Sequence, residues 1–381
     1  MSRTALCQVF GISRQTGYKW VRRFERTKKW TSLEECSRRP RMSPSATPMR
    51  LVKLILSQRR QFPTWGPVPI RKRLQTHWPR LPWPATSTIG AILKRHGMVA
   101  DRRRRYRVQP RSRPFSACRE PNDVWCVDFK GHFRTGDGRL CYPLTVMDAS
   151  SRYLLACVAF LAPTLENVRE AFVELFRTHG LPKAMRSDNG EPFASVSAAA
   201  GLTQLSVWWT KLGIRLERID PGKPQQNGRH ERMHLTLKID TCSPPRHSLG
   251  RQQRAFDRFR RIYNHERPHQ ALDLATPASL YVPSPRPLPE ELAPLQYPFS
   301  DCHRVRADGT IRWRKRKLFI SSTLAGELIG LNTLDSRYVQ VAFASLLLGL
   351  IDTRQPEYGL IRPKPDLRRN KTTQLSAMSP V

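Results

Sequence analysis

The sequence predicts a multidomain protein with a helical N-terminal region, a central α/β domain built on a mixed β-sheet, and a small all-β module near the C-terminus. Two observations lead to this fold class. First, three stretches rich in proline and arginine divide the 381 residues. Such stretches favour extended linkers, because proline removes a helix donor and arginines repel one another. Second, between the last two stretches, strand-like runs give way to alternating helix- and strand-like segments, as in a layered α/β domain. The three stretches are residues 37–48, 101–122 and 282–298.

The charge balance indicates a polyanionic partner. Lysine and arginine number 66 against 30 acidic residues, a net charge of +36. Nucleic acid fits this charge, because each neutralised phosphate releases condensed counterions. A membrane fits less well, since the longest apolar run, residues 339–351, is too short and interrupted to span a bilayer, and no secretory signal opens the chain. The eight cysteines form no CxxC pair, which favours free thiols in a reducing cytosol.

Residues 1–36 predict a helix-turn-helix DNA-binding region. Gly11 suits the tight turn, and Ser13 suits the N-cap of the second helix. The outer face of that helix carries side chains that can contact base edges and phosphates, namely Arg14, Gln15, Tyr18, Lys19 and Arg22. A basic surface helix without DNA specificity is the alternative. A helix-turn-helix core needs a third helix and few residues precede Ala5, so a truncated N-terminus is also expected.

Residues 48–98 predict a second helical domain, which either binds DNA or serves as a spacer. Leu51, Leu54 and Ile55 recur at helical spacing. After proline-rich turns, Ile89, Ile92 and Leu93 share one face of a helix that stops at Gly97 (all in).

The central domain is expected over residues 120–275. Strand-like runs at 123–129, 140–148 and 152–160 form a meander, followed by a helix at 165–179 and a short strand that ends at Asp188. A helix, a strand and a helix beginning near Asn227 complete the mixed sheet and its covering layers. Residues 300–352 contain further strand-like runs, and Asp308-Gly309 marks a hairpin turn there.

Three acidic residues fall where this architecture could bring them together. Asp128 lies in the first strand, Asp188 follows a later strand, and Glu231 begins a helix after a glycine-containing loop. A strand aspartate flanked by Val127 and Phe129 is costly to bury unless a cation or hydrogen-bond partner compensates it. Oxygen ligands without accompanying cysteines favour Mg²⁺ or Mn²⁺. Two such ions about 3.5–4 Å apart could activate a nucleophile and stabilise a leaving oxygen in phosphoryl displacement.

The motifs WCVDFKG, RSDNGEPFAS, PGKPQQNGRHE and YNHERPHQ resemble bacterial insertion-sequence transposases with a retroviral-integrase-like (DDE) catalytic core. The resemblance implies a ribonuclease-H-like catalytic domain, with Asp128, Asp188 and Glu231 as catalytic residues and ligands of two Mg²⁺ or Mn²⁺ ions. It also implies cleavage at the transposon ends, followed by attack of the 3′-hydroxyl on target double-stranded DNA. A C-terminal SH3-like module and a homo-oligomer assembled on DNA are expected as well. The resemblance further implies a bacterial cytoplasmic location, associated with the nucleoid.

Further DNA-binding candidates lie in the arginine-rich linker and around the glutamate motif. Asn227 and Lys238 match positions near the active site of the resembling family, and Lys238 lies one heptad after Glu231 on its helix face. The whole set is Arg102, Arg103, Arg104, Arg105, Lys223, Asn227, Arg229 and Lys238.

Other interpretations compete with this one. HExxH, a zinc-peptidase motif, occurs at 230–234 and 265–269, but the second copy has Pro268 inside the required helix and the first has no identifiable third ligand. These histidines would instead contact DNA phosphates or pack in the core. A catalytically decayed transposase that only binds DNA is another alternative, and so is a ribosomal or nucleoid structural protein. Asp148 is expected to cap a turn and pair with Arg152 rather than bind metal.

Overall fold

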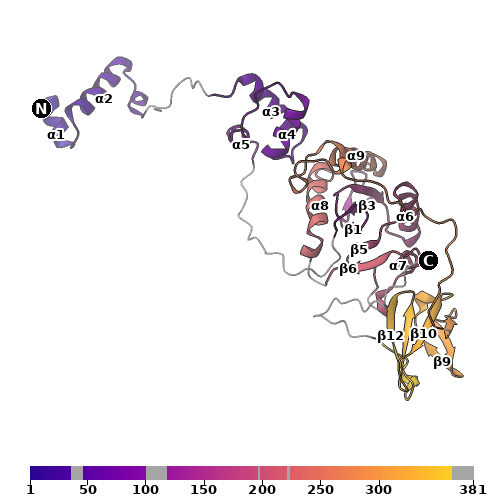
Figure 1. Ribbon diagram of the computed structural model, residues 1–381. Helices are drawn as coiled ribbons and strands as arrows, with labels where there is room; N and C mark the ends of the chain where they lie inside the picture. Colours follow the sequence, from indigo (N-terminus) through magenta and orange to yellow (C-terminus); the bar gives the residue numbers. More distant parts are fainter. Residues whose placement is uncertain (36–45, 100–117, 196–197, 221–223, 300, 363–381) are drawn as a thin grey trace. The chain divides into compact units, whose positions relative to one another are not determined.

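The computed structural model describes residues 1–35, 46–99, 118–195, 198–220, 224–299 and 301–362. The chain divides into two compact units, Met1–Leu51 and Val52–Val381, shown in Figure 1. Each unit is described by itself. The predicted linkers at 37–48 and 101–122 lie largely outside the described residues.

The N-terminal unit is a helix, a tight turn and a second helix. Gly11 turns the chain with φ +60°, and the Ser13 hydroxyl caps the second helix by accepting from the Thr16 N–H at 3.1 Å. The two helices approach closely at Gly17, where an added Cβ would lie 2.3 Å from the Cys7 Sγ. The elements are α1 (Arg3–Val9), α2 (Arg14–Thr27) and the short 3₁₀ helix η1 (Trp30–Leu33).

The second helical region has three helices, one more than the sequence suggested. The segment read as proline-rich turns contains an additional helix that begins at Pro67, directly after Gly66. Proline is tolerated there because the first helical N–H needs no intrahelical partner. Trp65, Ile70 and Ile89 are buried between the helices. The helices are α3 (Met49–Gln61), α4 (Pro67–His77) and α5 (Thr86–Arg95).

A mixed β-sheet forms the centre of the larger unit. Its strand order is β2-β3-β1-β5-β6, with β4 pairing on β3. β1 pairs antiparallel with β3, and β3 pairs antiparallel with β4, whereas β1 pairs parallel with β5, and β5 pairs parallel with β6. The strands are β1 (Val124–Phe129), β2 (Phe133–Arg134), β3 (Leu140–Asp148), β4 (Leu154–Phe160), β5 (Ala184–Ser187) and β6 (Arg215–Arg218).

Helices cover both faces of this sheet (Figure 1). Trp125 and Val127 of β1 point into an apolar core formed with two helices on one face. Met147 and Cys157 point into a second core, formed with two helices on the other face. The layers fit the ribonuclease-H-like core that the resemblance implied. The helices are α6 (Leu165–His179) and α7 (Gln204–Lys211) on the first face, and α8 (Gly228–Thr241) and α9 (Leu249–Arg261) on the second.

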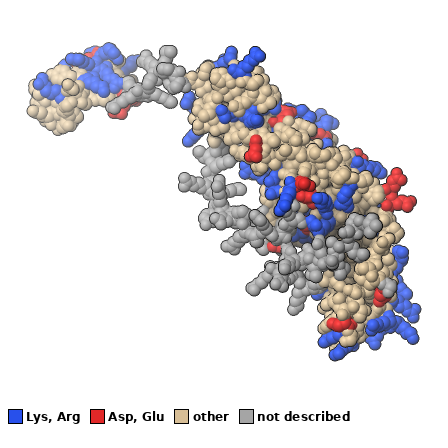
Figure 2. Space-filling view, viewed as in Figure 1, with Lys and Arg blue, Asp and Glu red and all other residues tan. Residues whose placement is uncertain are grey.

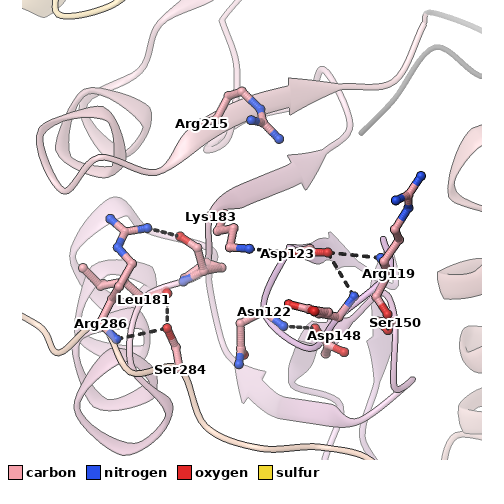
Figure 3. A network of polar contacts seen from close by, with 12 residues as sticks. Arg119, Asn122, Asp123, Asp148, Ser150, Leu181, Lys183, Arg215, Ser284 and Arg286 are labelled. Carbon is pink, nitrogen blue, oxygen red and sulfur yellow. Dashed lines mark hydrogen bonds and ion pairs between the residues drawn. The ribbon is translucent and has the colours of Figure 1, made fainter. Parts of the chain in front are cut away.

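The proline-rich stretch after the core is extended, as predicted, but it is bound to the core rather than free. The Ser284 N–H donates to the His179 carbonyl at 2.8 Å, and the Leu181 N–H donates to the Arg286 carbonyl at 2.7 Å. The Arg286 guanidinium also donates to the carbonyls of Pro182 and Leu212, at 3.0 and 2.9 Å. Figure 3 shows Arg286 and Ser284 against Leu181. We call this bound segment, residues 282–286, the strap.

The C-terminal residues form an all-β module. A five-stranded sheet has the order β13-β12-β11-β10-β7, and β8 and β9 form a separate hairpin. Gly309 turns the chain before β8 with φ +78°, while Arg314 and Lys315, both at positive φ, close the β8–β9 hairpin. The strands are β7 (Cys302–Arg304), β8 (Thr310–Trp313), β9 (Arg316–Phe319), β10 (Leu328–Thr333), β11 (Tyr338–Phe343), β12 (Leu346–Asp352) and β13 (Leu360–Ile361).

We expect Gly180→Ala to detach the strap and destabilise the core. Gly180 has φ +72° and ψ −174°, a backbone region that is nearly exclusive to glycine, and an added Cβ would lie 2.5 Å from the Ser284 carbonyl oxygen. The free energy of unfolding should fall by about 1–3 kcal/mol in urea titrations. Gly250→Ala is the matched control, because Gly250 lies within α9 with no atom near its missing Cβ, and it should be neutral or slightly stabilising. An equal fall in the free energy of unfolding of both variants would contradict the prediction that the bound strap stabilises the core.

Candidate active site

The sheet places two of the predicted acids at equivalent positions on neighbouring parallel strands. In the register of β1 and β5, Cys126 is opposite Arg186. Asp128 and Asp188 each follow two residues later, so both side chains are directed to the same face. Asp188 comes directly after β5, and the Gly190 N–H donates to its carboxylate at 3.1 Å. Glu231 approaches from the first turn of α8.

The three carboxylates act on one another electrostatically. Burial, followed by the charges of Asp188 and Glu231, raises the pKa of Asp128 to about 7, although Lys130 opposes the shift. One carboxylate oxygen each from Asp128 and Glu231 and one ring nitrogen of His234 lie within 4.8 Å of one another. A cation would relieve the repulsion in this partly desolvated place.

A buried polar cluster of Thr145, His230 and His234 lies next to Asp128. Thr145 lies opposite Asp128 in the β1–β3 register, and its hydroxyl donates to the Asp128 carbonyl at 3.0 Å. The Nε2 atoms of His230 and His234 lie 2.6 and 2.7 Å from the same hydroxyl. These two histidines are 0% and 1% exposed, so packing in the core, rather than contact with DNA phosphates, is the interpretation that the structure supports for them.

Neither HExxH copy has the geometry of a zinc-peptidase site within the described residues. In the first copy, the two histidine rings converge on the Thr145 hydroxyl. In the second copy, His265 and Glu266 belong to a π-helical turn that ends before Pro268. His269 therefore does not share an α-helical face with His265.

The remaining candidates around α8 have different surroundings. Asn227, directly before α8, is buried, and its side-chain oxygen has no hydrogen-bond partner among the described residues. The Arg229 guanidinium donates to the Ala149 carbonyl at 2.7 Å, and Lys238 is exposed on α8. The other predicted contacts, Arg102, Arg103, Arg104, Arg105 and Lys223, lie outside the described residues.

Asp148 caps a turn, as predicted, but its expected pairing with Arg152 is wrong. Its carboxylate accepts from the Ser151 N–H and hydroxyl at 2.7 and 2.6 Å, and from the Asn122 N–H at 2.8 Å. Figure 3 shows Asn122 beside Asp148. The local turn supplies two donors to this buried carboxylate and Asn122 supplies the third, whereas the Arg152 Nη1 has no hydrogen-bond partner among the described residues.

Sequence reasoning missed two features next to the acids. Thr145 and His234 form the support for Asp128, and only the cross-strand register brings them there. Arg186 and Glu217 form a buried ion pair, 2.8 Å apart, between β5 and β6. Arg186 alternates with Asp188 along one strand, which was the available signal that it points to the same face.

The predicted DNA-binding face of α2 is a continuous basic surface. Figure 2 shows Lys and Arg side chains gathered over the N-terminal unit. Seven side chains line one shallow hollow on this helix, and five of them are the predicted contacts. The seven are Arg14, Gln15, Tyr18, Lys19, Arg22, Arg23 and Arg26.

The cysteine side chains and the helix lengths do not change the candidate site formed by the three acids. The seven cysteines within the described residues are free. Across the same part of the chain, no helix combines the length and apolar character needed to cross a membrane.

Comparison with known proteins finds similar families and sequences. Residues 119–224 and 212–277 match models of the integrase core domain, and residues 2–61 match the leucine-zipper of insertion element IS481. The chain is 30% identical over 190 residues to an uncharacterized 31.7 kDa protein of insertion element IS407 from Burkholderia multivorans. These matches support a bacterial insertion-sequence protein with an integrase-like core over residues 119–277.

A second similar protein of a bacterial insertion element is more distant from this chain. The chain is 28% identical over 182 residues to an uncharacterized 39.2 kDa protein of insertion element IS476 from Xanthomonas euvesicatoria. The IS407 match covers 49% of this chain and 65% of that protein, and the IS476 match covers 47% and 50%. The chain thus spans between half and two thirds of the length of these relatives.

Solved integrase structures resemble it at low scores. A simian T-cell lymphotropic virus intasome in complex with the PP2A regulatory subunit B56 gamma matches at 18% identity and a TM-score of 0.38, over 78% of this chain and 97% of that chain. The HTLV-2 integrase catalytic core in complex with magnesium matches at 15% and 0.32, over 43% and 98%. The BIV integrase core matches at 18% and 0.32, over 42% and 93%. The fold of the central domain is therefore defined by its own strand order and helical layers, and not by these matches.

We expect Asp128→Asn to stabilise the ion-free protein at high pH. The folded-state pKa of Asp128 is raised from 3.8 to about 7, so its protonated form favours folding at low pH and this contribution is lost as pH rises through 7. The free-energy gap between variant and wild type should widen between about pH 4 and pH 7 and then level off, on the order of 2–4 kcal/mol.

Urea denaturation with a chelator across this pH range measures the gap. Saturating Mg²⁺ should shrink it by stabilising the wild type. A gap that does not change with pH would contradict the assignment of the raised pKa to Asp128.

Proposed function

We propose that this chain is a metal-dependent transposase that cleaves DNA at transposon ends and transfers the resulting 3′-hydroxyl into target DNA. The observation that carries the proposal is the approach of the Asp128 and Glu231 carboxylates, within 4.8 Å of each other, with Asp188 at the end of the adjacent parallel strand. Burial, followed by the charges of Asp188 and Glu231, raises the pKa of Asp128, as expected of a site that binds cations.

The three carboxylates would hold Mg²⁺ or Mn²⁺, two ions per site. Hard oxygen donors without a thiolate fit these ions, and a partly buried carboxylate beside two others fits a shared cation better than an empty cluster. When bound, the ions supply activation of the attacking oxygen and stabilisation of the leaving oxygen. Asp128, held by Thr145 on a central strand, fixes the position of the site relative to the sheet. Lys238, seven residues after Glu231 and exposed, would contact a DNA phosphate.

DNA would be held by several parts of the chain. The α2 face would form a helix-turn-helix reading surface, the linker arginines at 102–105 would follow the phosphate backbone, and the C-terminal module would bind DNA as an SH3-like domain. The net charge of +36 supports this distribution. Joining requires two transposon ends at one place, so a homo-oligomer assembled on double-stranded DNA follows from the proposed reaction.

A decayed transposase that only binds DNA is the second candidate. The presence of all three acids in converging positions favours catalysis, and the strand-transfer assay separates the two. Zinc peptidase activity has no comparable support, because the HExxH histidines converge on Thr145.

We expect purified protein to join oligonucleotides carrying the ends of its own element to target DNA in Mg²⁺ or Mn²⁺. Asp128→Asn, Asp188→Asn and Glu231→Gln should each lower the joining rate by about 100-fold or more, since each removes an ion ligand. Glu170→Gln is the control, because Glu170 is an exposed acid on α6, across the sheet from the site.

DNA binding without joining in the wild type would indicate the decayed protein. Joining that survives all three substitutions would place the chemistry elsewhere. Peptide cleavage in Zn²⁺ alone, with no DNA joining, would overturn the proposed function.

We expect Arg22→Ala to weaken binding to transposon-end DNA and to reduce the salt dependence of binding. Each lost phosphate contact should lower the slope of log K against log salt by about 1. Gln15→Ala should instead change the preference between end and unrelated DNA, because glutamine reads base edges. Arg3→Ala is the control with the same charge change, since Arg3 is paired with Glu25 at 2.8 Å. Fluorescence anisotropy across a salt series measures all three, and an equal effect of Arg3→Ala would contradict the role of the α2 face.

A further inference from the structure

We propose that His234 supplies a nitrogen ligand, through Nδ1, to the divalent ion held between Asp128 and Glu231. The inference rests on the proposed function and adds a ligand of a different chemical class to its carboxylates. It makes His234 a residue of the ion site, although its ring is almost wholly buried.

The hydrogen bonds of Thr145 assign the protonation of His234. The Thr145 hydroxyl has one hydrogen, and the Asp128 carbonyl, 3.0 Å away, can only accept it. The Nε2 atoms of His230 and His234 must therefore both donate to the two lone pairs of this hydroxyl. The tautomers are assigned from this network, and they leave Nδ1 of each neutral ring as a lone pair.

The two Nδ1 lone pairs differ in what they face. The Nδ1 of His230 is buried with no hydrogen-bond partner among the described residues. The Nδ1 of His234 instead faces the Asp128 Oδ2 at 3.6 Å. Two electron-rich atoms directed at one another repel unless a proton or a metal cation lies between them, and 3.6 Å is too long for a hydrogen bond. Only His234 thus points its free nitrogen into the acidic site.

The distances fit shared coordination better than a hydrogen bond. A charge-assisted N–H···O bond is about 2.7–2.9 Å long, well below 3.6 Å. Ligand atoms about 2.0–2.2 Å from one ion lie about 3 Å apart when adjacent and a little over 4 Å apart when opposite. The 3.6 Å separation of the His234 Nδ1 and the Asp128 Oδ2 lies within this range.

Helix α8 and strand β3 hold the ring in this orientation. His234 lies three residues after Glu231, so both are on neighbouring faces of the same helix. Its Nε2 is tied to Thr145 on β3, which is also the strand that pairs with Asp128. A ligating histidine whose second nitrogen donates to a fixed acceptor is the usual arrangement at metal sites.

A nitrogen ligand should change which ion binds best. Mn²⁺ also suits oxygen ligands, but as a first-row transition ion it accepts an imidazole nitrogen more readily than Mg²⁺ does. The site should therefore bind Mn²⁺ more tightly than Mg²⁺ by more than a purely carboxylate site would.

The deciding measurement is pulsed electron paramagnetic resonance of Mn²⁺ bound to the full-length protein without DNA. The wild type should show nitrogen modulation from a directly coordinated ¹⁴N, and uniform ¹⁵N-histidine labelling should convert its pattern. His234→Asn should abolish the modulation and weaken Mn²⁺ binding in calorimetry by at least about tenfold, with a smaller effect on Mg²⁺. His230→Asn is the matched control, because it removes the neighbouring Thr145 donor but not the nitrogen that faces the acids, and the modulation should persist.

The outcomes separate this inference from the proposed function. Mn²⁺ that requires Asp128 but shows no histidine nitrogen in the wild type would overturn the inference and leave the carboxylate site intact. Nitrogen modulation that survives His234→Asn would overturn it as well. Mn²⁺ binding that is indifferent to Asp128→Asn and Glu231→Gln would overturn the ion site itself. If His234→Asn fails to fold, the labelled wild type still decides whether histidine coordinates the ion.

Discussion

The parallel pairing of β1 with β5 is the constraint on which the candidate site depends. Because Cys126 and Arg186 are in register, two further residues on each strand bring Asp128 and Asp188 to equivalent positions. The period of two along a strand then turns both to the face that α8 covers. A slip of one residue would turn Asp128 into the apolar core that Trp125 and Val127 now fill, and would turn those two side chains out of it, so that the carboxylate would have no partner. The apolar residues that alternate with Asp128 therefore fix the site as firmly as the acids themselves.

The order of elements in the core could be predicted, because its strands and helices are long and their apolar residues recur at regular spacing. α6 has the predicted bounds, and the meander of β1, β3 and β4 follows the predicted runs. α4 was missed because its prolines were taken as turn residues, although Pro67 stands where a helix accepts proline. The binding of residues 282–286 to the core was not predictable either. It depends on carbonyls at Leu212 and Pro182, which only the folded chain brings to Arg286.

The candidate site, like the fold, could be predicted only in part from the sequence. The three acids were identified through their motifs, since short patterns around Asp188 and Glu231 are readable without a structure. The support for Asp128 was not, because Thr145 looks like an ordinary strand residue and His234 looked like part of a chance HExxH match. Their relation to Asp128 exists only through the β1–β3 register and the packing of α8 on that face. Cross-strand partners of this kind leave no local signal in a single sequence.

The positive charge of the whole chain and the negative charge of the candidate site act in opposite directions on a DNA phosphate. A net charge of +36 attracts DNA to the protein, but the three acids would repel a phosphate from the point where the proposed reaction occurs. Burial makes this repulsion stronger, because it reduces screening around Asp128. Protonation of Asp128 removes one charge but also removes the best oxygen ligand. A divalent ion removes the repulsion and keeps the ligand, since it neutralises the carboxylates without protonating them and presents positive charge to the phosphate. The acidic site and the basic surface are thus compatible only when a cation joins them, and a neutral histidine ligand can strengthen that cation's binding without adding negative charge.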